Sequence, residues 1–240
     1  MNELSITAVP GGVEIWTLNR PQARNALTSD MARRIVAECE RADRSEEVAA
    51  IVLTGAGPGF CAGLDLTEFS KPDAPRDVVG KAIRRLRQFG KPVVGAVNGA
   101  AVTGGLELAL ACDMLIASPE AVFRDTHLKI GAMSGSGMTV HLPRAVGRGW
   151  ARRMILAGEP MSVETALRVG LVTEIVPAVE LLDSATALAG RIADMDSALS
   201  STTKRLCDAI ESTTPEEGLR LEAAALREHR KKGRAWNTGI

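Results

Sequence analysis

The feature of this sequence best suited to chemistry is a glutamate that follows a glycine pair inside an apolar run. Gly104 and Gly105 open the run Leu106–Cys112, in which Glu107 has apolar neighbours on every side. Glycine leaves no side chain to keep an oxygen atom from the N–H groups at a helix start, where the helix dipole is positive. Burying a carboxylate there is costly without a reason. The pattern predicts a donor site for an anion beside an acid or base, although a first-turn glutamate that only reaches water remains the alternative.

A second glycine-rich stretch lies earlier in the chain and includes Gly63, Leu64 and Asp65. Apolar runs at residues 48–53 and 93–97 precede the two glycine stretches and are typical of buried strands. If neighbouring strands bring both stretches to one point, an N–H group from each could bind one oxygen and stabilise the negative charge that develops on a carbonyl. For either stretch alone, ordinary turn geometry is a sufficient explanation.

The elements that must position these residues repeat in the order strand, turn, helix. Apolar patterning then becomes purely helical, with helices expected near residues 180–194, 197–211 and 215–232. We therefore expect an α/β fold with a parallel sheet, in which residues 1–180 form the core and residues 181–240 a C-terminal helical region. The apolar faces of these last helices favour self-association.

Composition excludes several other classes of function. Lys plus Arg and Asp plus Glu both number 29 in 240 residues, so no overall charge favours nucleic acid or a membrane surface. Aromatic residues make up only 3%, which disfavours base stacking. No apolar run is long enough to span a bilayer, and the N-terminus lacks a signal pattern. The four cysteines have no metal-ligand spacing and suit reduced thiols in a cytoplasmic protein.

Several motifs occur together in an order that resembles the enoyl-CoA hydratase/isomerase family, also called the crotonase superfamily. They read LNRPQARNAL, GPGFCAGLDL, KPVVGAVNGAAVTGGLELALACD, ACDMLIASPEAVF and RAVGRGWARRMILAGEPMSVETALRVGLVTEIVP. The match extends to about Val179. The resemblance implies a spiral of repeated ββα units, a C-terminal trimerisation region and a homotrimer or dimer of trimers. It also implies an acyl-CoA thioester substrate, with coenzyme A as part of that substrate, no separate cofactor and no metal.

The resemblance assigns roles to particular residues. It places the backbone N–H groups of Leu64 and Gly104 in an oxyanion hole that stabilises a thioester enolate, and Glu107 as a catalytic acid or base. The residues expected to bind the substrate or its coenzyme A portion are Ala23, Arg24, Ala62 and Asp65. An arginine facing phosphate is physically reasonable, but a solvated surface position explains Arg24 almost as well.

The sequence departs from the family where hydratases carry a second glutamate. That loop here reads Asp125–Thr126–His127, so His127 stands in the second acid/base position. An imidazole can be a base or, once protonated, an acid near pH 7, but a structural histidine is an equal alternative. Asp125 could orient it or could form an Asx turn. Ser134 and Ser136 replace the proline and small residue that the family has near the acyl chain, which predicts a more polar pocket.

Three functions follow from these observations. The first is an enoyl-CoA hydratase, which adds water to a 2-enoyl-CoA. The second is another reaction of the family, such as that of an isomerase, hydrolase or decarboxylase, using Glu107 with His127 or Asp125. The third is an acyl-CoA-binding protein without activity, which has kept the oxyanion hole and lost the second acid.

Overall fold

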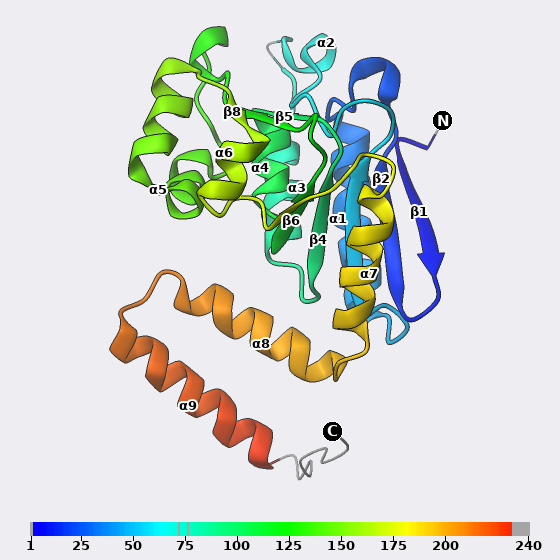
Figure 1. The fold of residues 1–240 in the computed structure, drawn as a ribbon, viewed down its shortest axis with the longest axis vertical. Helices are drawn as coiled ribbons and strands as arrows, with labels where there is room; N and C mark the ends of the chain where they lie inside the picture. Colours follow the sequence, from blue (N-terminus) through cyan, green and yellow to red (C-terminus); the bar gives the residue numbers. More distant parts are fainter. Residues whose placement is uncertain (1, 72, 76, 232–240) are drawn as a thin grey trace.

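A computed structural model describes residues 2–71, 73–75 and 77–231, so the end of the predicted C-terminal region lies outside the described residues. Within these residues the larger sheet has six strands in the order β1-β2-β3-β4-β6-β9 (Figure 1). They are β1 (Leu4–Val9), β2 (Val13–Leu18), β3 (Ala50–Gly55), β4 (Val93–Val97), β6 (Met114–Ala117) and β9 (Glu174–Ile175). The pair β1–β2 is an antiparallel hairpin, and every other pair is parallel. The expected parallel α/β sheet is confirmed.

A second, smaller sheet is formed by strands that come after strands of the larger sheet in the chain. It contains β5 (Ala100–Val102), β7 (Val122–Arg124) and β8 (Met161–Ser162), with β5 and β7 parallel. The strand β5 follows β4, and β7 follows β6, so each turn supplies one strand to each sheet. This repetition is the arrangement expected for stacked ββα units. The sequence pattern did not predict β5 or β8, which have three and two residues.

Helices cover both faces of the larger sheet. Those before the C-terminal region are α1 (Ser29–Arg44), α2 (Leu66–Phe69), α3 (Asp77–Arg87), α4 (Gly104–Ala109), α5 (Met138–Ala157) and α6 (Val163–Arg168). Alternate residues of a strand point to opposite faces. Thus Ile51 and Leu53 of β3 join the core cluster that contains α1 and α3, whereas Ala50 and Val52 join the cluster on the other face. A break at Gly147 (φ 77°, ψ 158°) divides α5 into two segments.

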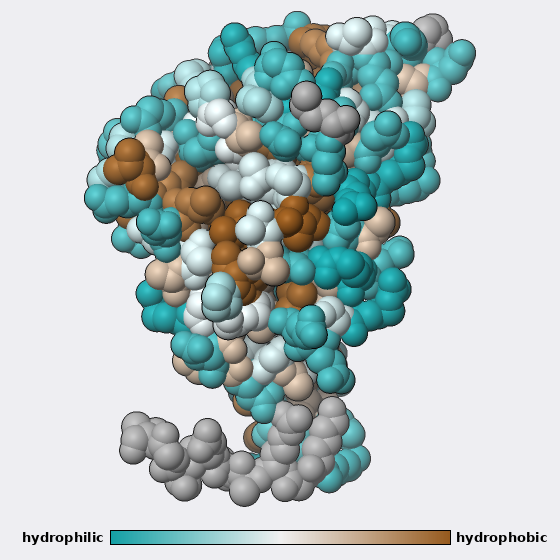
Figure 2. Space-filling view, turned by 90° about the vertical axis from the view of Figure 1, so that its right-hand side faces the viewer, coloured by the Kyte–Doolittle hydropathy of each residue, from teal (hydrophilic) through white to brown (hydrophobic). Residues whose placement is uncertain are grey.

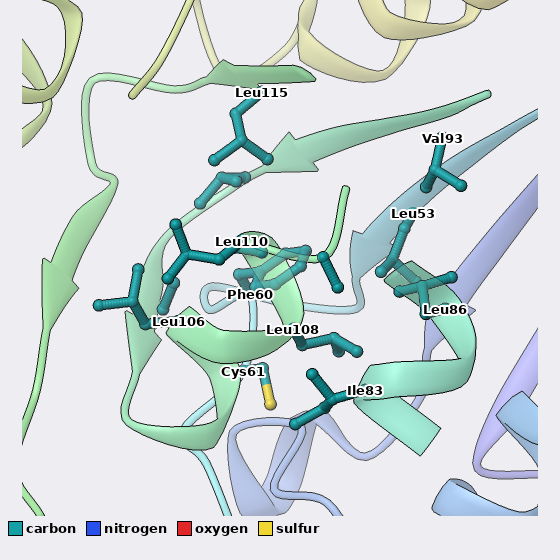
Figure 3. Packing of buried hydrophobic residues seen from close by; sticks show 14 of the residues in the cluster. Leu53, Phe60, Cys61, Ile83, Leu86, Val93, Leu106, Leu108, Leu110 and Leu115 are labelled. Carbon is teal, nitrogen blue, oxygen red and sulfur yellow. The ribbon is translucent and has the colours of Figure 1, made fainter. Parts of the chain in front are cut away.

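The short helix α4 lies inside the main core. Figure 3 shows Leu106, Leu108 and Leu110 of this segment among Phe60 and Ile83. Leu106 and Leu108 are completely buried, so packing fixes α4 on most sides. Any polar group on this helix is therefore held in one place by the surrounding apolar side chains.

The C-terminal helices are α7 (Leu181–Ala193), α8 (Ser197–Ile210) and α9 (Pro215–Lys231). Leu181, Ala185 and Ala189 of α7 pack on the larger sheet. In Figure 1, α8 and α9 run side by side below the sheet, and they contact each other. The helical C-terminal region is thus present, while its separation from the core at residue 180 stays a prediction. No helix among the described residues combines the length and the apolar composition needed to cross a membrane.

Candidate active site

The two glycine stretches are joined through the backbone. Leu27 N–H donates to the carbonyl of Gly63 (2.7 Å), and Asp65 N–H donates to the carbonyl of Leu27 (2.9 Å). One turn further on, Cys61 N–H donates to Ala100 (3.0 Å) and so ties this stretch to β5. Because β5 pairs with β7, the segments that follow successive strands of the larger sheet stack side by side. This stacking brings residues near 64, 104 and 127 to one place.

The N–H groups of Leu64 and Gly104 lie close enough to act on one oxygen atom. A Cβ atom placed on Gly63, whose φ is +95°, would lie 3.3 Å from the nitrogen of Gly104, and one placed on Gly104 would lie 3.6 Å from the nitrogen of Leu64. Among the described residues, no hydrogen bond engages either N–H group. Two neighbouring free donors are the geometry that an oxyanion hole requires.

The turn before α4 is held in an unusual conformation. Thr103 has φ +54° and ψ −109°, a region that β-branched residues rarely adopt. Its N–H donates to the carbonyl of Arg124 (2.8 Å), and its hydroxyl lies 2.6 Å from that of Thr126. Gly105 contacts the neighbouring stretch so closely that a Cβ there would lie 2.1 Å from the carbonyl oxygen of Cys61. These contacts fix where the N–H of Gly104 points.

A cavity of about 730 Å³ opens beside this turn. Its polar lining includes Glu107 from α4, Thr126 and His127 from the loop after β7, and Asp77 and Arg84 from α3. The other lining residues are Ala62, Leu64, Leu66, Phe69, Ser70, Val79, Gly80, Thr103, Ile130, Ala132, Met133, Gly135 and Ser136. An apolar cavity with a few convergent polar groups is typical of a binding site for a small molecule.

Glu107 is held by two donors from the loop and helix that follow. Its carboxylate is buried, with the residue only 3% exposed. The oxygen Oε1 accepts a hydrogen bond from the hydroxyl of Ser134 (2.5 Å) and one from the N–H of Met138 (3.3 Å). Buried charge needs such partners. The expectation of a cleft carboxylate, rather than one that reaches water at the rim, is consistent with this burial.

His127 and Asp125 form a buried pair. The two residues are 8% and 2% exposed. Asp125 Oδ1 lies 2.7 Å from His127 Nδ1 and also accepts the N–H of His127 at 3.0 Å, so Asp125 both forms the Asx-type turn and contacts the ring. Burial alone would lower the pKa of His127, but the hydrogen bond and charge of Asp125, with the charge of Glu107, raise it above its usual value. Such an imidazole can carry a proton near neutral pH.

Of the four residues expected to contact coenzyme A, Ala62 alone lines the cavity. Its N–H donates to the carbonyl of Arg24 (3.0 Å). Arg24 has an exposed side chain, and Ala23 precedes it in a short 3₁₀ turn; neither lines the cavity. Asp65 caps α2 through the N–H of Thr67 and pairs with Arg20 (2.8 Å), outside the cavity lining.

Two features of the site were missed from the sequence. Ser134 was expected to make the acyl pocket more polar, but its hydroxyl contacts Glu107 instead. Arg84, which the sequence did not single out, is exposed and also lines the cavity. A hydroxyl in place of a family proline was the signal for Ser134. No pattern in α3 separates Arg84 from its neighbouring arginines. The described residues include no group of three or more His, Cys, Asp or Glu able to hold a metal ion.

Comparisons with known proteins agree with this geometry. The enoyl-CoA hydratase/isomerase family matches residues 9–235. A probable mitochondrial enoyl-CoA hydratase of Dictyostelium discoideum is 36% identical over 221 residues, covering 91% of this chain and 80% of that protein. The crystal structure of an enoyl-CoA hydratase from Mycobacterium tuberculosis H37Rv is 42% identical, has a TM-score of 0.80 and covers 96% of this chain and 100% of that one. An enoyl-CoA hydratase from Bacillus anthracis is 28% identical with a TM-score of 0.90, covering 94% and 90%.

The chain therefore belongs to the enoyl-CoA hydratase/isomerase family, the crotonase superfamily. It is an enzyme of that family, whose members act on acyl-CoA thioesters.

Proposed function

We propose that this enzyme hydrates 2-enoyl-CoA thioesters, with Glu107 and His127 as its acid/base groups. The observation that carries the proposal is the convergence of both side chains on one cavity beside the free N–H groups of Leu64 and Gly104. The relatives named as enoyl-CoA hydratases support the same reaction.

The proposed reaction begins with the thioester oxygen bound to the N–H groups of Leu64 and Gly104. Water attacks Cβ, and the electron pair of the double bond moves towards the carbonyl to give an enolate. The two N–H groups stabilise the negative charge on its oxygen. Glu107 takes a proton from the attacking water, and Cα then gains a proton to complete the addition.

His127 is proposed to be the second proton carrier. Its hydrogen bond to Asp125 through Nδ1 leaves Nε2 available, and its raised pKa keeps a larger fraction of the ring protonated near pH 7. A protonated imidazole can donate the proton that Cα requires. A neutral imidazole can instead share the attacking water with Glu107.

The coenzyme A portion is proposed to lie along the loop before α1. Ala62 lines the cavity and is joined to the carbonyl of Arg24, so the acyl site and this loop are adjacent. The exposed guanidinium of Arg24 is suited to a phosphate. Ala23 and Asp65 complete the proposed binding segment, with Asp65 acting through its ion pair to Arg20.

Incubation of the purified enzyme with crotonyl-CoA tests the reaction. Hydration is expected to appear as loss of the conjugated thioester and formation of 3-hydroxybutyryl-CoA. If neither change occurs, but 3-butenoyl-CoA is converted to crotonyl-CoA, the enzyme is an isomerase. Binding of both thioesters without conversion would instead identify an acyl-CoA-binding protein.

Isomerisation is the second candidate because an imidazole replaces the second carboxylate at position 127. Moving a double bond requires one group that takes a proton from Cγ and returns it to Cα. Glu107 alone could do both. The same enolate forms, so the oxyanion hole serves either reaction.

The enzyme is further proposed to form a homotrimer or dimer of trimers in the cytoplasm. The C-terminal region exposes large apolar side chains, among them Leu199, Leu219 and Leu226 on α8 and α9 and Met195 between α7 and α8. Apolar surface also gathers on the side of the molecule where β1 and α7 lie (Figure 2). Free cysteines at positions 39, 61, 112 and 207 suit a reducing compartment. Light scattering that gives a monomer mass at all concentrations would contradict the assembly.

A further inference from the structure

The hydroxyl of Ser134 contacts the carboxylate of Glu107. It is 2.5 Å from Glu107 Oε1, and Ser134 itself does not line the cavity. The N–H of Met138, the first residue of α5, lies 3.1 Å from the Ser134 oxygen and 3.3 Å from the same Glu107 oxygen. Three polar groups from α4, the 131–137 loop and α5 thus meet at one point.

The direction of these hydrogen bonds is fixed by chemistry. The N–H of Met138 can only donate, so the Ser134 oxygen accepts from it. The single hydroxyl proton of Ser134 is then left for the carboxylate of Glu107. Hydrogen bonds to an ionised carboxylate are shorter and stronger than neutral ones.

From this geometry we infer that Ser134 is a positioning residue, which holds Oε1 of Glu107 and leaves Oε2 as the oxygen that exchanges protons with the substrate. The inference rests on the proposed role of Glu107 in proton transfer. Free rotation of the carboxylate would present either oxygen, in a range of orientations. Anchoring Oε1 removes that freedom before the substrate arrives.

Loss of the Ser134 hydroxyl should also change the proton affinity of Glu107. A hydrogen bond to the charged form of a carboxyl group favours that form, so its removal raises the pKa. The other charged groups around Glu107 are His127, with Asp125 behind it, and Asp77 and Arg84 from α3 across the cavity. All of these charged groups remain in a Ser134 variant. A change in the titration of Glu107 can therefore be attributed to the lost hydroxyl.

The test is a titration of the Glu107 carboxyl carbon by NMR, in protein labelled with ¹³C-glutamate. The Glu107 signal is the one that disappears in Glu107→Gln. Ser134→Ala should raise the titration midpoint by about one pH unit, the size expected for one hydrogen bond to a charged group. Ser134→Cys, whose thiol donates weakly, should shift it the same way by less, and Ser134→Thr should keep the wild-type midpoint.

Thr139→Ala is the matched control, because Thr139 has an exposed hydroxyl on α5 and does not line the cavity. It should leave the Glu107 titration unchanged. If Ser134→Ala and Ser134→Cys also leave it unchanged, Ser134 is not a positioning residue. A merely structural role would lower stability in these variants without moving the titration.

The titration needs no turnover, so it separates this inference from the proposed reaction. Wild-type enzyme that fails to hydrate crotonyl-CoA overturns the proposed function, whatever the titration gives. Wild-type hydration together with an unmoved Glu107 midpoint overturns only the role of Ser134. If both are correct, the acidic limb of the pH–rate profile moves upward in Ser134→Ala by the same amount as the midpoint.

Discussion

His127 is fixed by Asp125 through two hydrogen bonds to one oxygen atom. The ring nitrogen Nδ1 and the backbone N–H of His127 lie 2.7 Å and 3.0 Å from Oδ1 of Asp125. The turn that places the histidine and the contact that orients its ring therefore depend on the same carboxylate. With Nδ1 occupied, Nε2 is the nitrogen available to a substrate or water.

Asp125→Asn should lower the pKa of His127. The carboxylate offsets the effect of burial, and without its charge burial dominates. An NMR titration of the three histidines, with His127 assigned by His127→Gln, measures the change. Asp30→Asn, which removes an exposed carboxylate on α1, is the control. An unchanged His127 midpoint in Asp125→Asn would show that the pair is not electrostatically coupled.

The same pair should make stability depend on pH in a defined direction. In the folded state, burial lowers the pKa of His127, but Asp125 and Glu107 raise it by more. Folding therefore favours the protonated form of the ring. The resulting stabilisation is fully present below the unfolded pKa, about 6.5, and is lost as the pH rises through the folded value. Urea unfolding of wild type and His127→Gln at pH 6 and pH 9 should show a larger difference at pH 6. A larger difference at pH 9 would contradict the direction of the shift.

Gly105→Ala should disrupt the proposed oxyanion hole. The added methyl group would lie 2.1 Å from the carbonyl oxygen of Cys61, so the backbone beside Gly104 must move. We expect a loss of roughly 1–3 kcal/mol in the free energy of unfolding, as for overpacking, with a fall in turnover. Gly190→Ala in α7 is the control, since its methyl group meets no atom within 4 Å. That change should be neutral or stabilise the helix by roughly 0.5–1 kcal/mol.

How much of the fold could be predicted depended on the length of each apolar run. The strand β4 lies at residues 93–97, where continuous apolar residues predicted it, and β3 overlaps the apolar run at residues 48–53. The pairing of Cys61 with Ala101 could not be predicted, because isolated bridges leave no periodic signal. That pairing ties the first glycine stretch to β5, which leads into Gly104, whereas the Leu27–Leu64 bridge joins the first stretch to the loop before α1.

The sequence identified candidate residues of the site but not the hydrogen bonds that hold them in place. Glu107 stood out because a carboxylate in an apolar run needs a partner, and His127 because it departs from a family motif. The partner itself, Ser134, lies 27 positions from Glu107 and reaches it through the loop before α5. The strained backbone of Thr103 likewise depends on Thr126 and Arg124, which only the stacking of turns places beside it.

Arg24→Ala should weaken binding of the nucleotide end of the substrate alone. Its exposed guanidinium lies on the loop that also contacts Ala62. We expect the KM for crotonyl-CoA to rise several-fold, while the KM for crotonyl-pantetheine, which lacks the nucleotide, stays unchanged. Equal effects on both substrates would place Arg24 in a structural role instead.

Glu107→Gln addresses the central claim most directly, through the rate of crotonyl-CoA hydration compared with wild type. Glutamine keeps the shape of the side chain but cannot transfer a proton. The rate should fall by about 10²–10⁴-fold, as for a removed general acid or base, while calorimetry shows that the variant still binds crotonyl-CoA. A variant that hydrates crotonyl-CoA at nearly the wild-type rate would contradict proton transfer by Glu107.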